Sequence, residues 1–269
     1  MHILERFCTA VRHSRGLRNA EWLWNQLRAP YTVLLATVAK NGLVRVINGI
    51  DVIRLIPEHR TVAEAYEPEV WKRIMDEARS GDVVADVGAN IGLYTIALAK
   101  RVGDTGKVHA FEPDSANFCA LDRHCRLNQV TARVVTHQVA VAGTDAPVAF
   151  ESGRGPESHI RKGALVSEVD GVRLDSVFAG DHIDILKIDV EGFEEEVLKG
   201  ASGLLRDRAR GPRIIYIEVH PFAWAQFGTT SETLLTLLAD YGYCIEDLSG
   251  AVVGYVERYG EIVARRHEC

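Results

Sequence analysis

The stretch from Val83 to Lys100, VVADVGANIGLYTIALAK, decides the fold of this chain. Its first residues form an apolar, β-branched run typical of a buried strand, and its last eight place apolar side chains at helical spacing. The turn between them carries Gly88 and Gly92, which let the backbone bend tightly and approach a ligand without a Cβ clash. A strand, a glycine turn and a helix in this order predict that the free amides of the helix point at a bound ligand.

Beyond this stretch, strand patterns alternate with helix patterns. The clearest strands are KVHAFEP (107–113), IDILKIDVEG (183–192) and RIIYIEVH (213–220). This alternation predicts an α/β fold with a doubly wound, mainly parallel sheet. Before it, residues 2–28 show helical spacing and YTVLLATVAKNGLVRVINGIDVIRLI (31–56) predicts a β-hairpin. We therefore expect two parts, an N-terminal helix and β-hairpin extension over 1–60 and the main domain over 61–269.

Composition excludes several classes of partner. The formal net charge is −6 and the pI is about 5.9, so the chain lacks the clustered basic charge that nucleic acid binding requires. Five cysteines at unpatterned spacings indicate free thiols in a reducing compartment. No apolar run is long enough to cross a bilayer. These features predict a cytoplasmic protein without a nucleic acid or membrane partner.

Polar residues stand where the predicted strands end. Asp86, Glu112, Asp189, Glu218 and His220 each lie at or just after the carboxyl end of a strand pattern. Ligands of open α/β sheets bind outside the carboxyl ends of the strands, near the point where the strand order reverses. This series of strand ends is the strongest functional signal in the sequence.

The turn and the next strand predict an adenosine-containing cofactor. Glu112 follows the glycine turn by about 20 residues, where an acid accepts hydrogen bonds from the ribose hydroxyls. The turn reads GxNxG (Gly88, Asn90, Gly92) rather than the GxGxxG that admits a pyrophosphate. S-adenosylmethionine, which has no phosphate, fits this turn better. Asn90 is expected to order the loop, and Asp86 either meets the amino group of the cofactor or caps the turn.

Five segments together resemble the FkbM family of S-adenosylmethionine-dependent methyltransferases. They are YEPEVWKRI, VVADVGANIGLYTIALA, VHAFEPD, ILKIDVEGFEEEVLKGA and IIYIEVH, which span roughly residues 60 to 250. The resemblance implies a class I methyltransferase (Rossmann-like) fold over 61–269. It also implies O-methylation of a hydroxyl on a small molecule, such as a secondary metabolite in natural product biosynthesis or a sugar. The acceptor itself remains open.

Methyl transfer to an aliphatic hydroxyl needs a base. His220 lies two residues after Glu218 and shares its strand face, so the carboxylate can orient the imidazole and stabilise its protonated form. Asp189 ends the neighbouring strand, and all three are predicted catalytic residues. They could also bind a divalent metal; we favour base catalysis without a metal and keep the metal-dependent reaction as the alternative. Glu194, Glu195 and Glu196 are expected to act only as favourable charges at a helix N-terminus.

Other segments give weaker expectations. Tyr66 and Glu67 precede a helix, and in the resembling family this segment lies by the cofactor, so Glu67 is included among the cofactor-binding residues. The loop ESGRGPESHIRKG (151–163) suits a lid or a substrate contact, with Ser158 and His159 as its candidates. Aromatic residues after His220 either line the acceptor pocket, pack under the next helix or form a homodimer contact. These are Phe222, Trp224 and Phe227.

Two other classes of function stay open. A nucleotide-binding oxidoreductase could use a related sheet, and a non-catalytic cofactor-binding protein could retain the same turn. The GxNxG turn argues against the first class. Asp189, Glu218 and His220, present together, argue against the second.

Overall fold

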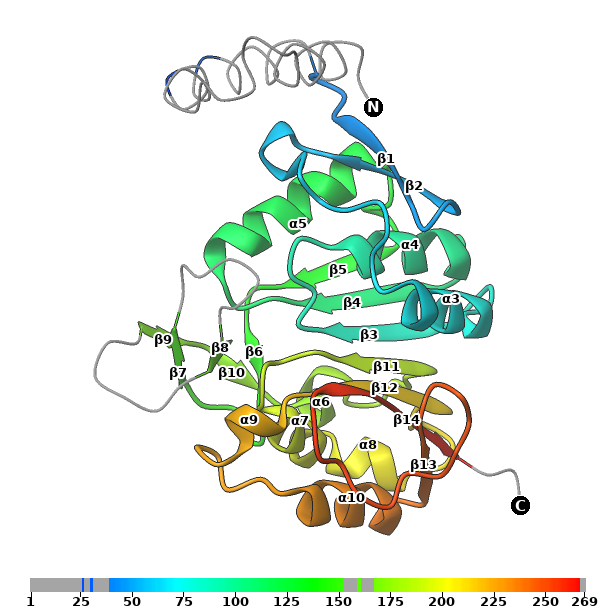
Figure 1. Ribbon diagram of the computed structural model, residues 1–269, viewed down its shortest axis with the longest axis vertical. Helices are drawn as coiled ribbons and strands as arrows, with labels where there is room; N and C mark the ends of the chain where they lie inside the picture. The colour runs from blue at the N-terminus through cyan, green and yellow to red at the C-terminus, as the bar shows by residue number, and fades with distance from the viewer. Residues whose placement is uncertain (1–25, 27–29, 31–38, 152–158, 161–166, 267–269) are drawn as a thin grey trace, which may run out of the picture.

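A computed structural model of the chain describes residues 26, 30, 39–151, 159–160 and 167–266. The helix expected over residues 2–28 lies outside this range apart from one residue. The central element is a sheet of seven strands in the order β13-β14-β12-β11-β3-β4-β5, with β14 antiparallel to both of its neighbours and the other pairings parallel (Figure 1). Its strands are β3 (Val83–Val87), β4 (Lys107–Phe111), β5 (Val134–His137), β11 (Ile185–Ile188), β12 (Ile214–Val219), β13 (Tyr243–Glu246) and β14 (Gly260–Arg266). The predicted mainly parallel α/β fold is confirmed.

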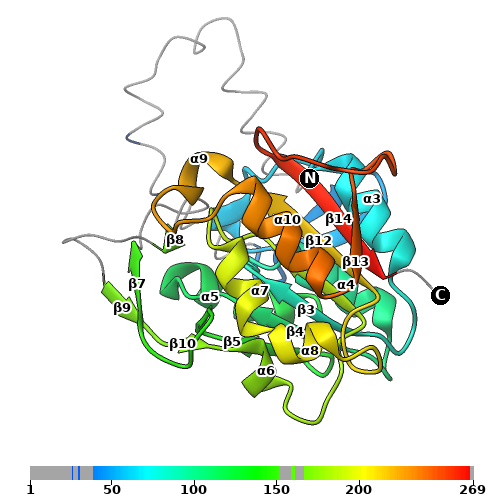
Figure 2. The same ribbon diagram turned by 90° about the horizontal axis from the view of Figure 1, so that it is seen from below.

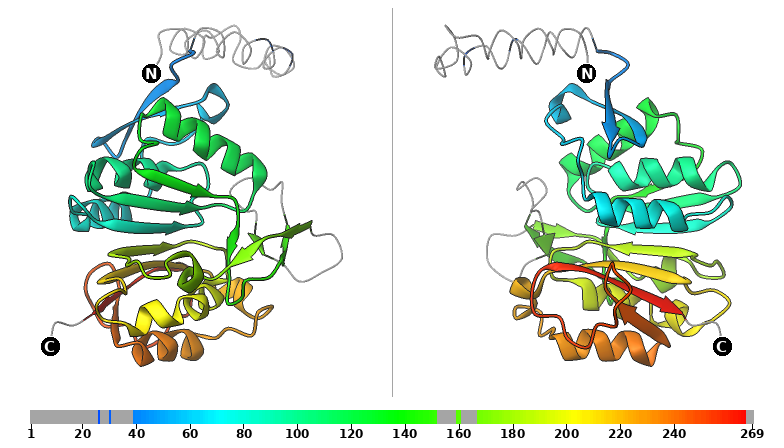
Figure 3. Two further views of the ribbon diagram at one scale, coloured as in Figure 1. Left: turned by 180° about the vertical axis from the view of Figure 1, so that it is seen from behind. Right: turned by 45° about the vertical axis from the view of Figure 1, so that its right-hand side comes forward.

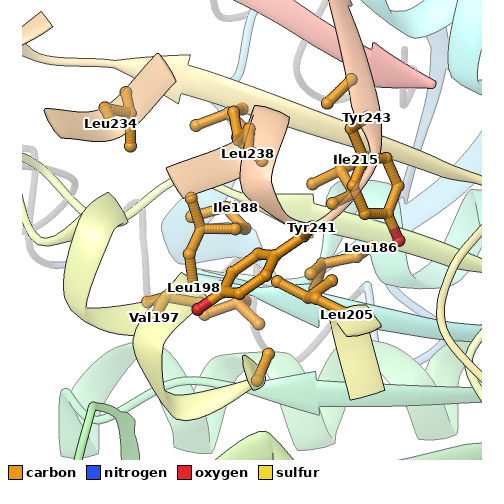
Figure 4. Close-up of a cluster of buried hydrophobic side chains, with 14 of the residues drawn as sticks. Leu186, Ile188, Val197, Leu198, Leu205, Ile215, Leu234, Leu238, Tyr241 and Tyr243 are labelled. Carbon is orange, nitrogen blue, oxygen red and sulfur yellow. The ribbon is translucent and has the colours of Figure 1, made fainter. Parts of the chain in front are cut away.

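Two apolar layers sandwich this sheet. One contains α6 (Leu174–Val177), α7 (Glu194–Gly200), α8 (Ser202–Arg206) and α10 (Ser231–Asp240). The close-up in Figure 4 shows Leu234 and Leu238 of α10 above Ile188 and Ile215 of the sheet, and Figure 2 shows α7, α8 and α10 together over that face. The other layer contains α3 (Pro68–Glu77), α4 (Leu93–Val102) and α5 (Ser115–Leu127).

The alternation of side chains along each strand assigns the polar strand residues to one face. Side chains two residues apart share a face, so Asp86, Lys187 and Glu218 lie on the same side as Val84, Ile185 and Ile214. Those three apolar residues belong to the cluster packed under α3 and α4. The polar residues therefore lie between the sheet and the α3–α4 layer.

The predicted β-hairpin consists of β1 (Leu43–Ile47) and β2 (Asp51–Leu55), which pair antiparallel. It packs against α4 and α5, as both views of Figure 3 show, and the short helix η1 (Pro57–His59) follows it. Ile47, Ile53 and Leu55 are buried in the same cluster as α3 and α4. The division into parts 1–60 and 61–269 stays a prediction.

His124 connects this hairpin to the glycine turn. It is fully buried on α5, where burial lowers its pKa to about 4 and keeps the ring neutral. Its Nε2 accepts a hydrogen bond from the Ile56 amide at 3.0 Å, and its Nδ1 donates to the Ile91 carbonyl at 2.8 Å. One side chain thus joins the end of the hairpin to the loop that follows β3.

The remaining elements form small additions beside the main sheet. Strands β6 (Ala140–Val141) and β10 (Gly171–Val172) pair parallel, while β7 (Val148–Glu151) pairs with β8 (His159–Ile160) and β9 (Ser167–Val169) (Figure 1). The short helix α9 (Pro221–Trp224) follows β12 directly. In the expected lid loop, Ser158 lies outside the described residues, as does the side chain of His159. No helix in the described part of the chain is long and apolar enough to cross a membrane.

Candidate active site

The glycine turn between β3 and α4 depends on residues that tolerate left-handed backbone. Gly88, Asn90 and Gly92 have φ values of 82°, 50° and 89°. A Cβ atom on Gly88 would lie 1.8 Å from the Asp189 carbonyl oxygen, so only glycine fits where the turn meets the end of β11. The turn after β3 and the residue after β11 are therefore packed directly against each other.

Glu112 closes this turn from the end of β4. Its side chain is buried, and its Oε2 accepts a hydrogen bond from the Asn90 amide at 2.8 Å. Its Oε1 accepts from the Asp114 amide, also at 2.8 Å. Burial raises the pKa of Glu112 to about 7 despite these two bonds. The Asn117 side chain also hydrogen-bonds to this carboxylate.

A pocket with about 570 Å³ of empty space, partly open to solvent, joins the turn to the ends of β4 and β11. Four predicted site residues line it: Gly88, Asn90, Glu112 and Asp189. The rest of its lining is Val87, Phe111, Pro113, Asn117, Val139, Ala140, Val141, Phe150, Val190 and Glu191. The polar strand ends therefore share this pocket with apolar side chains, a combination that is common in cofactor sites.

Three other predicted cofactor residues lie outside this lining. Asp86 is 1% exposed beneath α4, where its Oδ2 accepts from the Thr95 hydroxyl at 2.5 Å. Gly92 is the N-cap of α4. Glu67, the N-cap of α3, accepts a hydrogen bond from the Tyr94 hydroxyl at 2.8 Å. Of these, Glu67 belongs to a second polar region, at the end of β12.

In that second region, Asp189, Glu218 and His220 come together. One ligand atom from each lies within 4.8 Å of the other two. His220 is 2% exposed, and its Nε2 lies 3.7 Å from Glu218 Oε1 and 3.5 Å from Glu191 Oε2. Because Asp189 also lines the pocket, this trio adjoins the space beside the glycine turn.

Glu194 holds His220 in place. The expectation that Glu194 acts only as a favourable charge at a helix N-terminus is therefore wrong. Glu194 is fully buried. Its Oε1 accepts from His220 Nδ1 at 2.8 Å and from the Gly192 amide at 2.9 Å, and its Oε2 accepts from Trp224 Nε1 at 2.8 Å. Burial alone would lower the pKa of His220, but the bond to Glu194 and the nearby carboxylates raise it to about 9.

Lys187 is a second residue that the strand-end argument missed. It is 4% exposed inside β11, with Nζ 3.2 Å from Asp189 Oδ2 and 4.7 Å from the centre of the Tyr94 ring. Burial would lower the pKa of this ammonium, but Asp189 and Asp86 outweigh burial and raise it. The signal in the sequence was a single lysine within the apolar run ILKI.

Glu261 adds another carboxylate from β14. It lies directly opposite Glu218 in the antiparallel β12–β14 pair, and carboxylate oxygens of these two residues and Glu67 lie within 4.8 Å of one another. The Tyr259 hydroxyl donates to Glu218. Burial, together with the charge of Asp189, raises the pKa of Glu218 to about 7, and burial, together with the charge of Glu218, raises that of Glu261 to about 8.

Because Glu261 faces Glu218 across a strand pair, we predict that Glu261 destabilises the fold. A carboxyl whose folded pKa exceeds its ordinary value reduces stability as pH rises above that ordinary value. Glu261→Gln should therefore increase the free energy of unfolding by about 1 kcal/mol at pH 8 and by much less at pH 5. Urea denaturation at both pH values measures this, with Glu257→Gln, an exposed acid, as the control. An equal effect at both pH values would contradict the prediction.

The sequence is similar to those of known methyltransferases. Residues 86–245, more than half of the chain, match the Methyltransferase FkbM domain. Hexuronic acid methyltransferase AglP from Haloferax volcanii is 25% identical over 57% of this chain and 62% of its own length. The 31-O-demethyl-FK506 methyltransferase FkbM from Streptomyces tacrolimicus is 35% identical over 58% of this chain and 72% of its own length. The chain thus spans about three fifths of AglP.

Solved structures also resemble the chain. Methyltransferase FkbM from Methylobacillus flagellatus matches with 18% identity and a TM-score of 0.47, over 69% of this chain and 43% of that one. An S-adenosylmethionine-dependent O-methyltransferase from Thermotoga maritima matches with 15% identity and a TM-score of 0.47, over 78% of this chain and 69% of that one.

Proposed function

Because the chain belongs to the FkbM methyltransferase family, we propose that it transfers a methyl group from S-adenosylmethionine to a hydroxyl of a small molecule. The observation that carries this proposal is the position of His220, a buried imidazole that Glu194 holds in place and that lies beside Asp189 at the edge of the pocket. The names of the two curated relatives, one for a hexuronic acid and one for 31-O-demethyl-FK506, support a hydroxyl-bearing acceptor.

The residues around the glycine turn fit the cofactor. Gly88 lets the turn pack directly against Asp189, so that both residues line the pocket, and Glu112 presents a buried carboxylate for ribose hydroxyls. The apolar part of the pocket, which includes Phe111 and Phe150, suits an adenine ring. When bound, S-adenosylmethionine supplies a methyl group activated by its sulfonium. The protein then has to align the acceptor and remove its proton.

In the proposed reaction His220 removes that proton. Glu194 holds Nδ1, so Nε2 faces Glu218 and Glu191, on the side where an acceptor hydroxyl would lie. Nε2 would take up the proton of the acceptor oxygen, while bound S-adenosylmethionine would supply the methyl group to that oxygen and leave as S-adenosylhomocysteine. The carboxylates of Glu194 and Glu218 stabilise the resulting imidazolium.

Asp189, Glu218 and His220 also suit a divalent metal, which is the second candidate mechanism. Their oxygen and nitrogen atoms lie within 4.8 Å of one another, close enough to share one ion. Such a metal would lower the pKa of the acceptor hydroxyl directly. Lys187 weakens this alternative, because its ammonium lies 3.2 Å from Asp189 Oδ2 and competes for that oxygen. We therefore favour proton removal by His220.

Glu112 provides the test of the proposed cofactor site. Glu112→Gln should weaken binding of S-adenosylhomocysteine by about 10- to 100-fold at pH 8, because it removes charge-assisted hydrogen bonds to the ribose. In the unsubstituted protein affinity should fall as pH drops below about 7, where Glu112 takes up a proton. The glutamine variant should lose most of this pH dependence.

Isothermal titration with S-adenosylhomocysteine between pH 6 and pH 8.5 measures both effects. Asp122→Asn, on the outer part of α5, is the control and should leave the affinity and its pH dependence unchanged. A folded Glu112→Gln variant with unchanged affinity would show that Glu112 does not bind the cofactor.

A further inference from the structure

Lys187 is a buried cation to which the proposed reaction gives no role. It lies in β11, all four residues of which are buried, and only 4% of its surface is exposed. Moving an ammonium out of water is costly unless groups of opposite charge surround it. The contacts of this ammonium therefore have to explain why a lysine stands in an otherwise apolar strand.

The ammonium of Lys187 holds the carboxylate of Asp189. Its Nζ lies 3.2 Å from Asp189 Oδ2, and within the described part of the chain this is the only side-chain hydrogen bond of that carboxylate. Nζ also lies 4.7 Å from the centre of the Tyr94 ring, which adds a cation–π contact. The Asp189 side chain is 27% exposed and lines the pocket. Lys187 thus places a positive charge directly behind a carboxylate of the pocket wall.

Carboxylates from the neighbouring strands face the same ammonium. Asp86 lies directly beside Lys187 in the β3–β11 pair, and Glu218 on β12 shares its face of the sheet. Among the described residues, Asp86 Oδ1 is buried without a hydrogen-bond partner. Burial would lower the pKa of Lys187, but Asp189, Asp86 and the glutamates of β12 and β14 raise it. The lysine therefore stays charged.

A divalent ion would need the ground that this ammonium holds. Asp189, Glu218 and His220 offer two oxygens and one nitrogen, with one ligand atom of each within 4.8 Å of the others. An ion bound to Asp189 would lie beside Lys187, because the ammonium is already bonded to that carboxylate. Two cations so close together in a buried site repel each other strongly.

We propose that Lys187 occupies the cation position of this site and thereby excludes a divalent metal from Asp189. The ammonium supplies a fixed positive charge where a metal would otherwise bind. Removing that charge should turn Asp189, Glu218 and His220 into a metal site. The inference concerns which cation the site holds, so it goes beyond the proposed methyl transfer.

Lys187→Met tests the proposal, because methionine retains an unbranched side chain along the strand and has no charge. We expect this variant to bind one Mn²⁺ per chain at least tenfold more tightly than the unsubstituted protein at pH 8. Electron paramagnetic resonance of the free Mn²⁺ measures the affinity. Lys72→Met, the same substitution at an exposed lysine of α3, is the matched control and should leave the affinity unchanged.

A double variant separates metal exclusion from a purely structural role of the lysine. Adding Asp189→Ala to Lys187→Met should abolish the gained Mn²⁺ affinity, because it removes one of the three ligands. Mn²⁺ should also raise the Tm of Lys187→Met while leaving that of the unsubstituted protein unchanged. If Lys187→Met fails to fold, Lys187→Gln, which is also neutral, repeats both measurements.

Unchanged Mn²⁺ affinity in a folded variant at position 187 would overturn the proposal. A gain that Asp189→Ala leaves intact would overturn it as well. The same holds if the unsubstituted protein binds Mn²⁺ as tightly as Lys187→Met, since the ammonium would then exclude nothing. These measurements need no methyl transfer, so a failure of the proposed function would leave their outcome unaffected.

Discussion

Replacing His220 with asparagine should lower kcat by about 100- to 10,000-fold, because positioned general bases contribute about this much to proton transfer. Asparagine can place its amide nitrogen where Nδ1 lies, so it keeps a donor for Glu194 but has no base on the other side. Affinity for S-adenosylhomocysteine should remain nearly unchanged, since proton removal acts only in the transition state. Methyl transfer and calorimetry on the same folded variant measure the two quantities.

The pH dependence of the unsubstituted protein provides a second measurement. With a His220 pKa of about 9, the basic form is the minor one at pH 7 and becomes the major one above pH 9. The acceptor kcat/KM should therefore rise with pH, reach half of its maximum near pH 9 and level off above it. Retention of most activity in His220→Asn would exclude His220 as the base.

A chelator separates this mechanism from its metal-dependent alternative. EDTA should leave turnover nearly unchanged if His220 acts as the base. Complete loss of activity in EDTA, with recovery on addition of Mg²⁺ or Mn²⁺, would assign Asp189, Glu218 and His220 to a metal site instead.

Replacing Glu194 with glutamine is the second substitution with a large expected effect. Glu194 accepts three hydrogen bonds while fully buried, and a glutamine side chain places an NH₂ group against one of the three donors. We expect the free energy of unfolding to fall by about 1 to 3 kcal/mol. At pH 9, kcat should fall by about 10- to 1,000-fold, because the imidazole loses its orientation.

The pH profile tests whether Glu194 acts through His220. Glu194 raises the pKa of His220, so its neutral replacement should move the midpoint of the kcat/KM profile, and with it the start of the plateau, from near pH 9 towards the ordinary histidine value of about 6.5. Glu196→Gln, on the same helix and partly exposed, is the control and should leave the plateau in place. A destabilised Glu194→Gln variant with an unmoved plateau would limit Glu194 to a structural role.

The sequence predicted the parallel core of the fold and one side of the site. Glycines, apolar runs and helix patterns locate β3, β4, β11 and β12, and strand order then brings their carboxyl ends to one edge. This reasoning found Glu112 and Asp189, which do line the pocket. It relies on short-range patterns, which a single sequence displays directly.

The positions of the missed residues depend on the pairing of strands that are distant in the sequence and on burial in the folded chain. Glu194 looks like any acid at a helix start, and only tertiary packing buries it against His220 and Trp224. Glu261 faces Glu218 because β14 runs antiparallel beside β12, with a pairing that no local pattern specifies. Asp86 ends up beneath α4 because its strand face is covered by that helix.

His124 has a consequence for anyone who recombines this protein with its relatives. Its two ring nitrogens serve backbone groups from two separate segments, the amide of Ile56 and the carbonyl of Ile91. A chimera that takes α5 from a relative without this histidine would leave the Ile56 amide and the Ile91 carbonyl without their partner and loosen the loop beside the pocket. The crossover points for such exchanges therefore have to keep Ile56, Ile91 and His124 from one parent.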